Sequence, residues 1–230
     1  MSAHAVSPVY LGRKTRRQNS EQRRLTILRA ALNIAAQDGV RAIRHRIVAQ
    51  QAKVPLSATT YYFKDIHDLI TDAFVLFSHE AKTLYIDPFW AEASGRLEQE
   101  RVRSGATLNV RNWLCQDVSH QGAKYIVKVV QENRQYLQTE IAFLDAALHD
   151  EHLRSAALSY LDHTLAGMRW LMNELDLPDP DLLAKSFFSL VRRMMLEAML
   201  GKKEALDPVQ VENQLCGYLR SICAVPAAVV

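Results

Sequence analysis

The stretch from residue 44 to residue 63, RHRIVAQQAKVPLSATTYYF, constrains the fold most, because one proline separates two short helical patterns. Val48, Ala49 and Ala52 in the first pattern lie at helical spacing, so they form one small apolar face. Pro55 has no amide hydrogen and disfavours helix at the residue before it, so one helix ends there and a second begins. The stretch therefore predicts two short helices joined by a tight turn.

The second helical pattern, which starts at Pro55, is rich in small, hydroxyl and aromatic side chains. Small side chains allow a helix to enter the major groove of DNA, and hydroxyls and phenols can hydrogen-bond phosphates and base edges. The pattern is typical of a helix-turn-helix that binds DNA. The alternative is an ordinary buried hairpin in a helical protein.

The distribution of charge favours the DNA-binding interpretation. Residues 1–64 contain twelve Lys or Arg and two Asp or Glu, a net charge of about +10. Residues 65–230 contain sixteen and 23, a net charge of about −7, so the overall +3 conceals a basic N-terminal quarter on an acidic body. This asymmetry is expected of a module that binds a polyanion.

The composition predicts an all-α protein of one or two domains, because good helix formers dominate and only eight Gly and seven Pro occur in 230 residues. No apolar run approaches the roughly 20 residues of a membrane span, and residues 1–19 have no signal-peptide core, so we expect a cytoplasmic protein. Cys115, Cys216 and Cys223 form no CxxC pair. We therefore expect no metal site and no disulfide framework, with a redox-sensing cysteine as the alternative.

A third helix is predicted ahead of the two short ones, from an apolar stripe over residues 21–37 that Gly39 ends. Ser20 is placed to cap the start of this helix. A basic cluster from Arg13 to Arg17 precedes it. The cluster is either a solvated tail or a flexible arm that contacts DNA.

Several short motifs combine over residues 20–70. They are Gly39-Val40 after the first helix, the pattern Ile47-Val48-Ala49-x-x-Ala52-x-Val54, and a tyrosine-rich helix that ends in Tyr62-Phe63 and leads into Asp68-Leu69. In combination they resemble the DNA-binding domain of the TetR family of repressors. The resemblance implies a flexible basic arm (1–19), a helix-turn-helix domain (20–65), and a helical effector-binding and dimerisation domain (66–230).

Carried over position by position, the resemblance implies three groups of DNA contacts. The first group lies at the start of the second helix, where the family contacts the operator: Arg44, His45 and Arg46. The second group lies on the next helix at positions that read bases: Leu56, Ser57, Ala58 and Thr60. The third group matches positions that contact phosphates: Tyr61, Tyr62 and Lys64. The alternative for Thr59, Tyr62 and Phe63 is packing in the core of the head. Leu56 and Ala58 cannot hydrogen-bond bases, so base-specific readout depends mainly on Arg46 and the hydroxyls.

The sequence departs from the family pattern at three positions. Lys53 stands where the turn usually has glycine, and Ile43-Arg44 replaces the usual threonine cap of the second helix. Ile66 stands where a lysine is common, with Lys64 nearby. These departures affect individual contacts rather than the fold.

The rest of the chain is a succession of helical patterns. We predict helices over 66–85 (ended by Asp87-Pro88), 89–103, 107–120, 123–149, 152–175, 181–200 and a final one opened by Asp207-Pro208. The last two carry the strongest stripes, Leu183, Phe187, Leu190 and Met194, then Val211, Leu215, Tyr218 and Ile222. Two such helices suit a four-helix homodimer interface, unless both stripes only pack inward.

Aromatic and methionine side chains in the body are candidates for an effector pocket, although such residues at helical spacing also form plain core. The candidates are Phe74, Phe77, Trp113, Tyr125, Phe143, Trp170 and Met194. The chain has no HExxH, GxSxG, phosphate-binding loop or convincing set of metal ligands, so we predict no enzyme, metal or cofactor. An apolar or amphipathic organic effector is the expectation.

The sequence thus predicts a homodimeric TetR-like regulator, most simply a repressor released from a palindromic operator by a small ligand. One alternative is a helical carrier or enzyme for a lipophilic compound with an incidental basic end. Another is a DNA-binding architectural protein without an effector, which a body of about 165 residues does not favour.

Overall fold

The protein was analysed as a computed structural model that describes residues 10–13, 18–201 and 206–224. Within these ranges the regular structure is entirely helical, which confirms the predicted all-α class. The chain divides into two compact units. The first contains residues 1–84 and 135–161, and the second contains residues 85–134 and 162–230.

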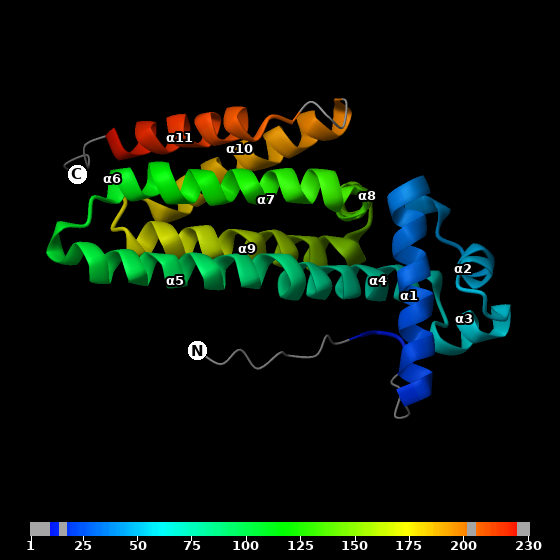
Figure 1. Ribbon diagram of the computed structural model, residues 1–230. Helices are drawn as coiled ribbons and strands as arrows, with labels where there is room; N and C mark the ends of the chain where they lie inside the picture. Colours follow the sequence, from blue (N-terminus) through cyan, green and yellow to red (C-terminus); the bar gives the residue numbers. More distant parts are fainter. Residues whose placement is uncertain (1–9, 14–17, 202–205, 225–230) are drawn as a thin grey trace. The chain divides into compact units, whose positions relative to one another are not determined.

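Three helices form the N-terminal part of the first unit: α1 (Gln18–Asp38), α2 (His45–Gln51) and α3 (Leu56–Tyr62) (Figure 1). A 3₁₀ turn, Val40–Ala42, follows α1. Gly39 ends α1 at φ 81°, a conformation that glycine adopts without steric cost. We call residues 18–63 the head. The prediction that Ser20 caps α1 was wrong, because the helix already includes Gln18.

The turn between α2 and α3 has the geometry that the sequence pattern implied. Lys53 lies at φ 54°, so the family's usual glycine position is left-handed in this chain as well. Val54 donates its amide to Ala49 O at 3.0 Å, which closes the turn. Pro55 lies in extended conformation immediately before α3. The predicted helix-turn-helix is therefore present, with Lys53 in a strained conformation.

The first unit also contains α4 (Ile66–Ala81), α8 (Arg134–His149, apart from its first residue) and the first half of α9 (Glu151–Glu174). Asp65 caps α4 by accepting the His67 amide at 2.9 Å. The buried side chains of α1, among them Ile27, Leu28 and Ile34, share this core, since α1 packs against α4. The head thus draws stability from helices outside it, as its small size requires.

The second unit contains α5 (Asp87–Ser104), α6 (Val110–Trp113), α7 (Ser119–Glu132), the second half of α9, α10 (Pro180–Leu200) and α11 (Pro208–Ala224). Helix α7 packs against α10 and α11 (Figure 1). Asp179 caps α10 by accepting the Leu182 amide at 3.2 Å.

Three predicted helix boundaries in the body were wrong. Asp87-Pro88 does not end a helix, because a π-helical segment, Lys82–Ile86, connects α4 to α5 and accommodates the proline at the start of α5. The helix predicted over 107–120 begins at Val110 and continues through a second π-helical segment, Leu114–Val118, into α7. The long helix predicted over 123–149 is interrupted at Asn133.

The stripes of the last two helices are partly buried inside their own unit. Phe187, Met194, Val211 and Leu215 are all at most 5% exposed. A different side of α10 exposes Leu182, Leu196 and Leu200 by 57%, 45% and 80%. The inward-packing alternative thus holds for much of the predicted stripes, and an apolar side of α10 remains on the surface of the single chain.

In the parts of the chain that the structure covers, no helix combines the length and apolar character that crossing a membrane requires. Cys115 and Cys216 are free thiols, and the side chain of Cys223 lies outside the described residues. The basic residues Lys14, Arg16 and Arg17 lie outside them too. The predicted division at residues 19 and 65 stays a prediction, since the compact unit around the head extends over α4 and residues 135–161.

Candidate DNA-binding face and effector site

One side of α2 and α3 is fixed to the core of the head. Val48 and Ala49 are buried on α2, and Phe63, immediately after α3, is fully buried. The Thr59 hydroxyl is buried and donates to Leu56 O at 2.8 Å. The buried Tyr62 phenol pairs with Ser20 Oγ of α1 at 2.9 Å. The core-packing alternative is therefore confirmed for Thr59, Tyr62 and Phe63.

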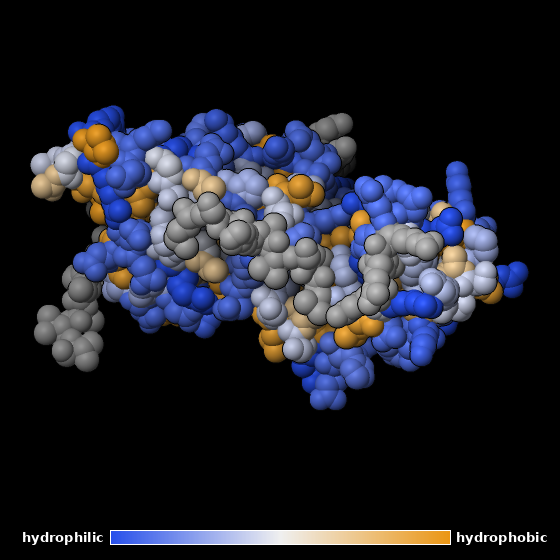
Figure 2. Space-filling view, turned by 90° about the horizontal axis from the view of Figure 1, so that it is seen from below, coloured by the Kyte–Doolittle hydropathy of each residue, from blue (hydrophilic) through white to orange (hydrophobic). Residues whose placement is uncertain are grey.

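The other side of these helices is exposed and carries most of the predicted DNA contacts. Leu56 is 49% exposed and Tyr61 52%. In the view of Figure 2, the part of the head that grey atoms do not cover is mostly hydrophilic, with a few apolar patches. The exposed members of the predicted set are Arg44, Arg46, Leu56, Ser57, Thr60, Tyr61 and Lys64. We call these seven residues the DNA-binding face.

Three of the ten predicted contact residues lie deeper. Tyr62 is 5% exposed, Ala58 is half-buried, and His45 is half-buried. The buried Nδ1 of His45 has no hydrogen-bond partner among the described residues. Burial lowers the pKa of His45, although the charge of Asp65 acts in the opposite direction. Their contacts with DNA stay predictions, and the packing gives Tyr62 a structural role in the head.

Three of the predicted effector residues come together in the first unit. Phe74 and Phe77 on α4 stack with Phe143 on α8, with ring centroids 5.0 Å apart for Phe74 and Phe143. Tyr136 and Tyr160 complete the group, at 5.2 and 5.6 Å from Phe77. We call these five residues the aromatic cluster. Phe74 and Phe143 are fully buried, so the cluster is part of the core in this structure.

A buried carboxylate adjoins the aromatic cluster. Glu140 is 6% exposed, and its Oε1 accepts a hydrogen bond from the Tyr160 hydroxyl at 2.8 Å. The Tyr160 and Tyr136 hydroxyls are 2.9 Å apart. Burial, the charge of Glu140 and the neighbouring Tyr136 raise the pKa of Tyr160 well above its ordinary value. Sequence reasoning missed Glu140, although its position four residues after Tyr136 and three before Phe143 places it on the same face of α8.

The other four effector candidates lie in the second unit and do not belong to the aromatic cluster. Trp113 and Met194 are buried, whereas Tyr125 and Trp170 are half-buried. The Tyr125 ring contacts Phe89 with centroids 5.0 Å apart. The predicted set is therefore spread over both units, because aromatic residues at helical spacing occur in both, and a role of these four residues in effector binding stays a prediction.

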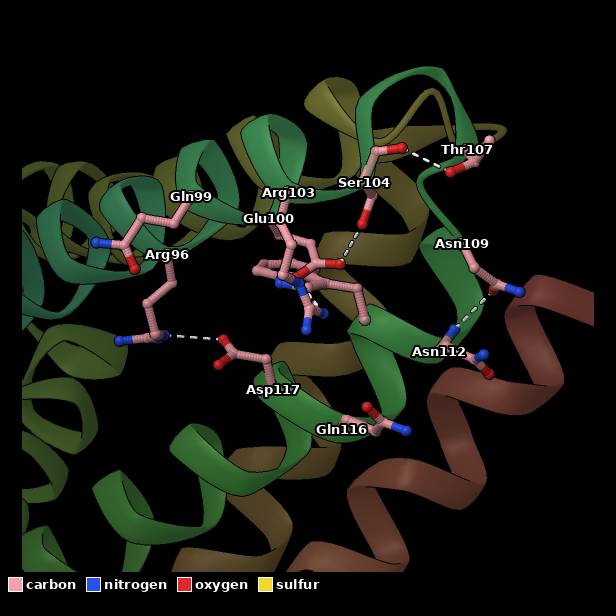
Figure 3. A pocket seen from close by; sticks show the side chains of 11 residues that line it. Arg96, Gln99, Glu100, Arg103, Ser104, Thr107, Asn109, Asn112, Gln116 and Asp117 are labelled. Carbon is pink, nitrogen blue, oxygen red and sulfur yellow. Dashed lines mark hydrogen bonds and ion pairs between the residues drawn. The ribbon is translucent and has the colours of Figure 1, made fainter.

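The second unit has a groove of about 560 Å³ between the C-terminal half of α5 and residues 107–117 (Figure 3). Trp113 is its one aromatic lining residue, and amide and charged side chains form most of the rest. Arg96 binds Asp117 at 2.8 Å, and hydrogen bonds from Arg103 and Ser104 lower the pKa of Glu100. The charged groups are thus paired within the groove. Its polar lining differs from the apolar pocket that the sequence predicted.

No group of three or more His, Cys, Asp or Glu side chains suited to a metal ion occurs among the described residues.

Comparison with known proteins identifies the fold. No family model and no curated protein matches the chain. Solved structures do match. A TetR-family member from Streptomyces coelicolor shares 22% identity at a TM-score of 0.58, covering 86% of this chain and 98% of its own. The multidrug binding protein EbrR in complex with proflavin also shares 22% identity, at a TM-score of 0.53, covering 85% and 99%. The chain has the TetR fold.

A third match to the TetR fold is a Mesorhizobium loti structure proposed to be a TetR-family regulator, at 17% identity and a TM-score of 0.65 over 92% of this chain and 98% of that one. Because the identities are low, the likeness concerns the fold. It confirms the predicted architecture, in which a three-helix head precedes a helical body. Within the TetR fold, the DNA-binding face and the aromatic cluster are the two candidate sites of this chain.

Proposed function

We propose that this protein is a DNA-binding transcriptional regulator of the TetR type, whose hold on a palindromic operator is changed by a small organic ligand. The observation that carries the proposal is the DNA-binding face itself. Its side chains are exposed, rich in hydroxyls and basic groups, and mounted on helices that Thr59, Tyr62 and Phe63 fix from behind. The net charge of about +10 on residues 1–64 supplies the attraction to phosphates.

A homodimer is part of the proposal, because a palindromic operator presents two half-sites about 34–36 Å apart. The apolar side of α10, with Leu182, Leu196 and Leu200 exposed, supports an isologous contact between two chains. Val209 at the start of α11 is a further exposed apolar residue, with 63% of its surface accessible.

The aromatic cluster with Glu140 is the proposed effector site. Aromatic ring faces and a buried carboxylate both attract positive charge, so an aromatic ligand that carries a positive charge fits this chemistry. Two structures of EbrR, at 22% and 24% identity to this chain, are complexes with proflavin and with ethidium. The ligand would insert among the rings of Phe74, Phe77 and Phe143, which now contact one another.

The structure of the first unit offers a route from this site to the head. The aromatic cluster takes two of its rings from α4, the helix that follows the head in the chain. On α8, Gln135 precedes Tyr136 of the cluster and donates to Asn33 of α1 at 2.6 Å. A ligand that moves α4 or α8 would therefore act on α1. The effect is a shift between head arrangements that fit or do not fit two half-sites.

The test is DNA binding by the purified full-length protein. We expect a complex with DNA from its own promoter that is tighter than with a scrambled sequence and that weakens steeply as salt rises. Absence of a salt-sensitive, sequence-preferring complex would overturn the proposal. The carrier or enzyme alternative predicts ligand binding or turnover without any DNA complex.

The effector part has a separate test in the absence of DNA, because dyes such as ethidium bind DNA themselves. We expect ethidium to raise the thermal midpoint of the wild-type protein, and to do so less in Glu140→Gln, which loses the negative charge but keeps the shape. Equal shifts in both proteins would argue against a cation site at Glu140.

A further inference from the structure

The segment Tyr10–Arg13, which we call the N-terminal strap, is tied to α4 through one carboxylate. Leu11 N donates to Asp72 Oδ1 at 2.6 Å, and Gly12 N donates to Asp72 Oδ2 at 2.9 Å. Each carboxylate oxygen thus receives one backbone amide of the strap. Asp72 is a fully buried acidic residue on α4. It is not one of the predicted DNA contacts, so its burial needs another explanation.

Asp72, Arg24 and Glu21 form a polar cluster beneath the strap. Arg24 of α1 is 3% exposed and has Nη1 at 3.7 Å from Asp72 Oδ2. It also binds Glu21 through Nε at 3.1 Å, and its guanidinium lies 3.7 Å from the centre of the Tyr10 ring. Burial raises the pKa of Asp72, while the strap amides and the charge of Arg24 act in the opposite direction. Because unpaired buried charges are costly, the strap has a defined path.

Gly12 has no room for a side chain. A Cβ at this position would lie 2.8 Å from Phe63 Cε1 and 2.9 Å from Asp72 Oδ2. Phe63 is fully buried in the head, so its ring has nowhere to move. Any larger residue at position 12 would therefore lift the strap away from α4.

The strap ends beside α3. Arg13 N donates to Tyr62 O at 2.9 Å, at the C-terminal end of α3. The Arg13 guanidinium stacks on the exposed Tyr61 ring, 4.3 Å from its centre, and the residue is exposed. Stacking uses the flat face of a guanidinium and leaves its N–H edge for an anion. Arg13 thus lies next to Tyr61 of the DNA-binding face.

We propose that Arg13 and Tyr61 form a phosphate clamp on operator DNA, and that Gly12 and Asp72 are positioning residues that hold Arg13 in place. The proposal rests on the proposed DNA-binding function and deepens it. The contact is to the DNA backbone, so it adds affinity equally for all sequences. A DNA phosphate accepts hydrogen bonds from the N–H edge of the Arg13 guanidinium, while stacking on the Tyr61 ring fixes the plane of the guanidinium.

The test compares full-length variants by their affinity for promoter and scrambled DNA over a range of salt concentrations. Arg13→Ala should reduce the slope of log affinity against log salt by about 0.9, which corresponds to a loss of about eightfold at 0.1 M salt on both DNAs. Arg154→Ala is the matched control, since Arg154 is exposed on α9 of the same unit and carries the same charge. It should leave the slope unchanged.

The positioning role is tested by Gly12→Ala alone and combined with Arg13→Ala. If the strap acts on DNA through Arg13, Gly12→Ala should lower the slope towards that of Arg13→Ala, and the double variant should lower it no further. A purely structural strap would change the thermal midpoint and leave the salt slope intact.

Two results would overturn the proposal. One is an Arg13→Ala slope equal to that of Arg154→Ala, and the other is full additivity in the double variant. Failure of the wild-type protein to bind DNA is a different result, because it refutes the DNA-binding function itself.

Discussion

The DNA-binding face and the aromatic cluster differ in whether the residues proposed to bind a partner also stabilise the fold. In α3 the two roles are divided between sides of one helix: Thr59 and Tyr62 are buried, while Ser57, Thr60 and Tyr61 are exposed. In the aromatic cluster the candidate ligand contacts are themselves the core, with Phe74 and Phe143 fully buried.

This difference determines which of the two sites can be mutated without a loss of stability. Exposed residues on the DNA-binding face can vary with little effect on folding, because their neighbours behind the helix hold it in place. A ligand at the aromatic cluster must replace contacts between rings that already stabilise the protein. If the proposed effector site is correct, ligand binding and stability are coupled at the aromatic cluster, whereas DNA binding and stability are separable at the DNA-binding face.

The largest expected effect is a loss of stability on mutation of the aromatic cluster. Phe143→Ala should lower the free energy of unfolding by about 3–5 kcal/mol, because it removes a fully buried ring stacked on Phe74 and Phe77. Tyr61→Ala on the DNA-binding face should change it by about 0.5 kcal/mol or less. Urea denaturation of both variants measures the contrast. A loss of less than about 1 kcal/mol for Phe143→Ala would mean that the surrounding side chains fill the space left by the ring, so the cluster contributes little to stability.

The next effect concerns division of labour within the DNA-binding face. Arg46→Ala should cost about 1–3 kcal/mol of discrimination between promoter and scrambled DNA, since an arginine reads base edges through paired hydrogen bonds. Lys64→Ala should weaken both DNAs alike and reduce the salt slope by about 1. Titrations of both variants against both DNAs provide the measurement. Equal effects on discrimination would refute the separate roles of the two residues.

The same comparison explains how far the sequence could predict the structure. The helices of the head followed from apolar spacing and from the breaks at Gly39 and Pro55, and its exposed face followed from the family resemblance. Helix ends in the body were harder to predict, because Pro88 by itself predicts the end of a helix, whereas the π-helical segment before it leads directly into α5. Local propensity does not include such a segment.

The two candidate sites also differed in how well the sequence could predict their residues. At the DNA-binding face, seven of the ten predicted residues are exposed, and all of them except Leu56 are polar or charged. At the effector site, apolar periodicity selects core residues in either unit, so it grouped Phe143 with Trp113 and Met194. The group that distinguishes the aromatic cluster is Glu140, a polar residue within an apolar stripe, whose burial became visible only in the folded chain. The strap was missed because its contacts join residues about 60 positions apart.

A smaller effect is expected at the turn that orients α3. Lys53→Gly should raise the free energy of unfolding by up to about 1 kcal/mol, because glycine relieves the left-handed strain at φ 54°, offset by its greater freedom in the unfolded chain. Lys53→Ala keeps the strain and should match the wild type within about 0.5 kcal/mol. Thermal unfolding of both variants tests this. Destabilisation by glycine would show that Lys53 makes a stabilising contact that outweighs the strain.

The smallest effect concerns His45, which lies where the DNA-binding face meets the core. Burial lowers the pKa of His45 in the folded state, so the unfolded chain binds the proton more tightly. The stability contributed by neutral His45 is therefore present above the unfolded pKa of about 6.5 and is lost as the pH falls below it. We expect the wild type to lose more stability than His45→Gln between pH 7.5 and pH 5.0, measured by urea denaturation.

The difference between the two proteins isolates His45, because every other residue is the same in both. DNA binding sharpens the assignment further. If His45 contacts a phosphate, bound DNA favours its protonated form, and the wild type should gain affinity relative to His45→Gln as the pH falls. If it belongs to the core, the relative affinity should not rise. An identical stability loss in both proteins would instead show that the burial of Nδ1 has no energetic consequence, and His45 would then be assigned to the exposed side of the comparison.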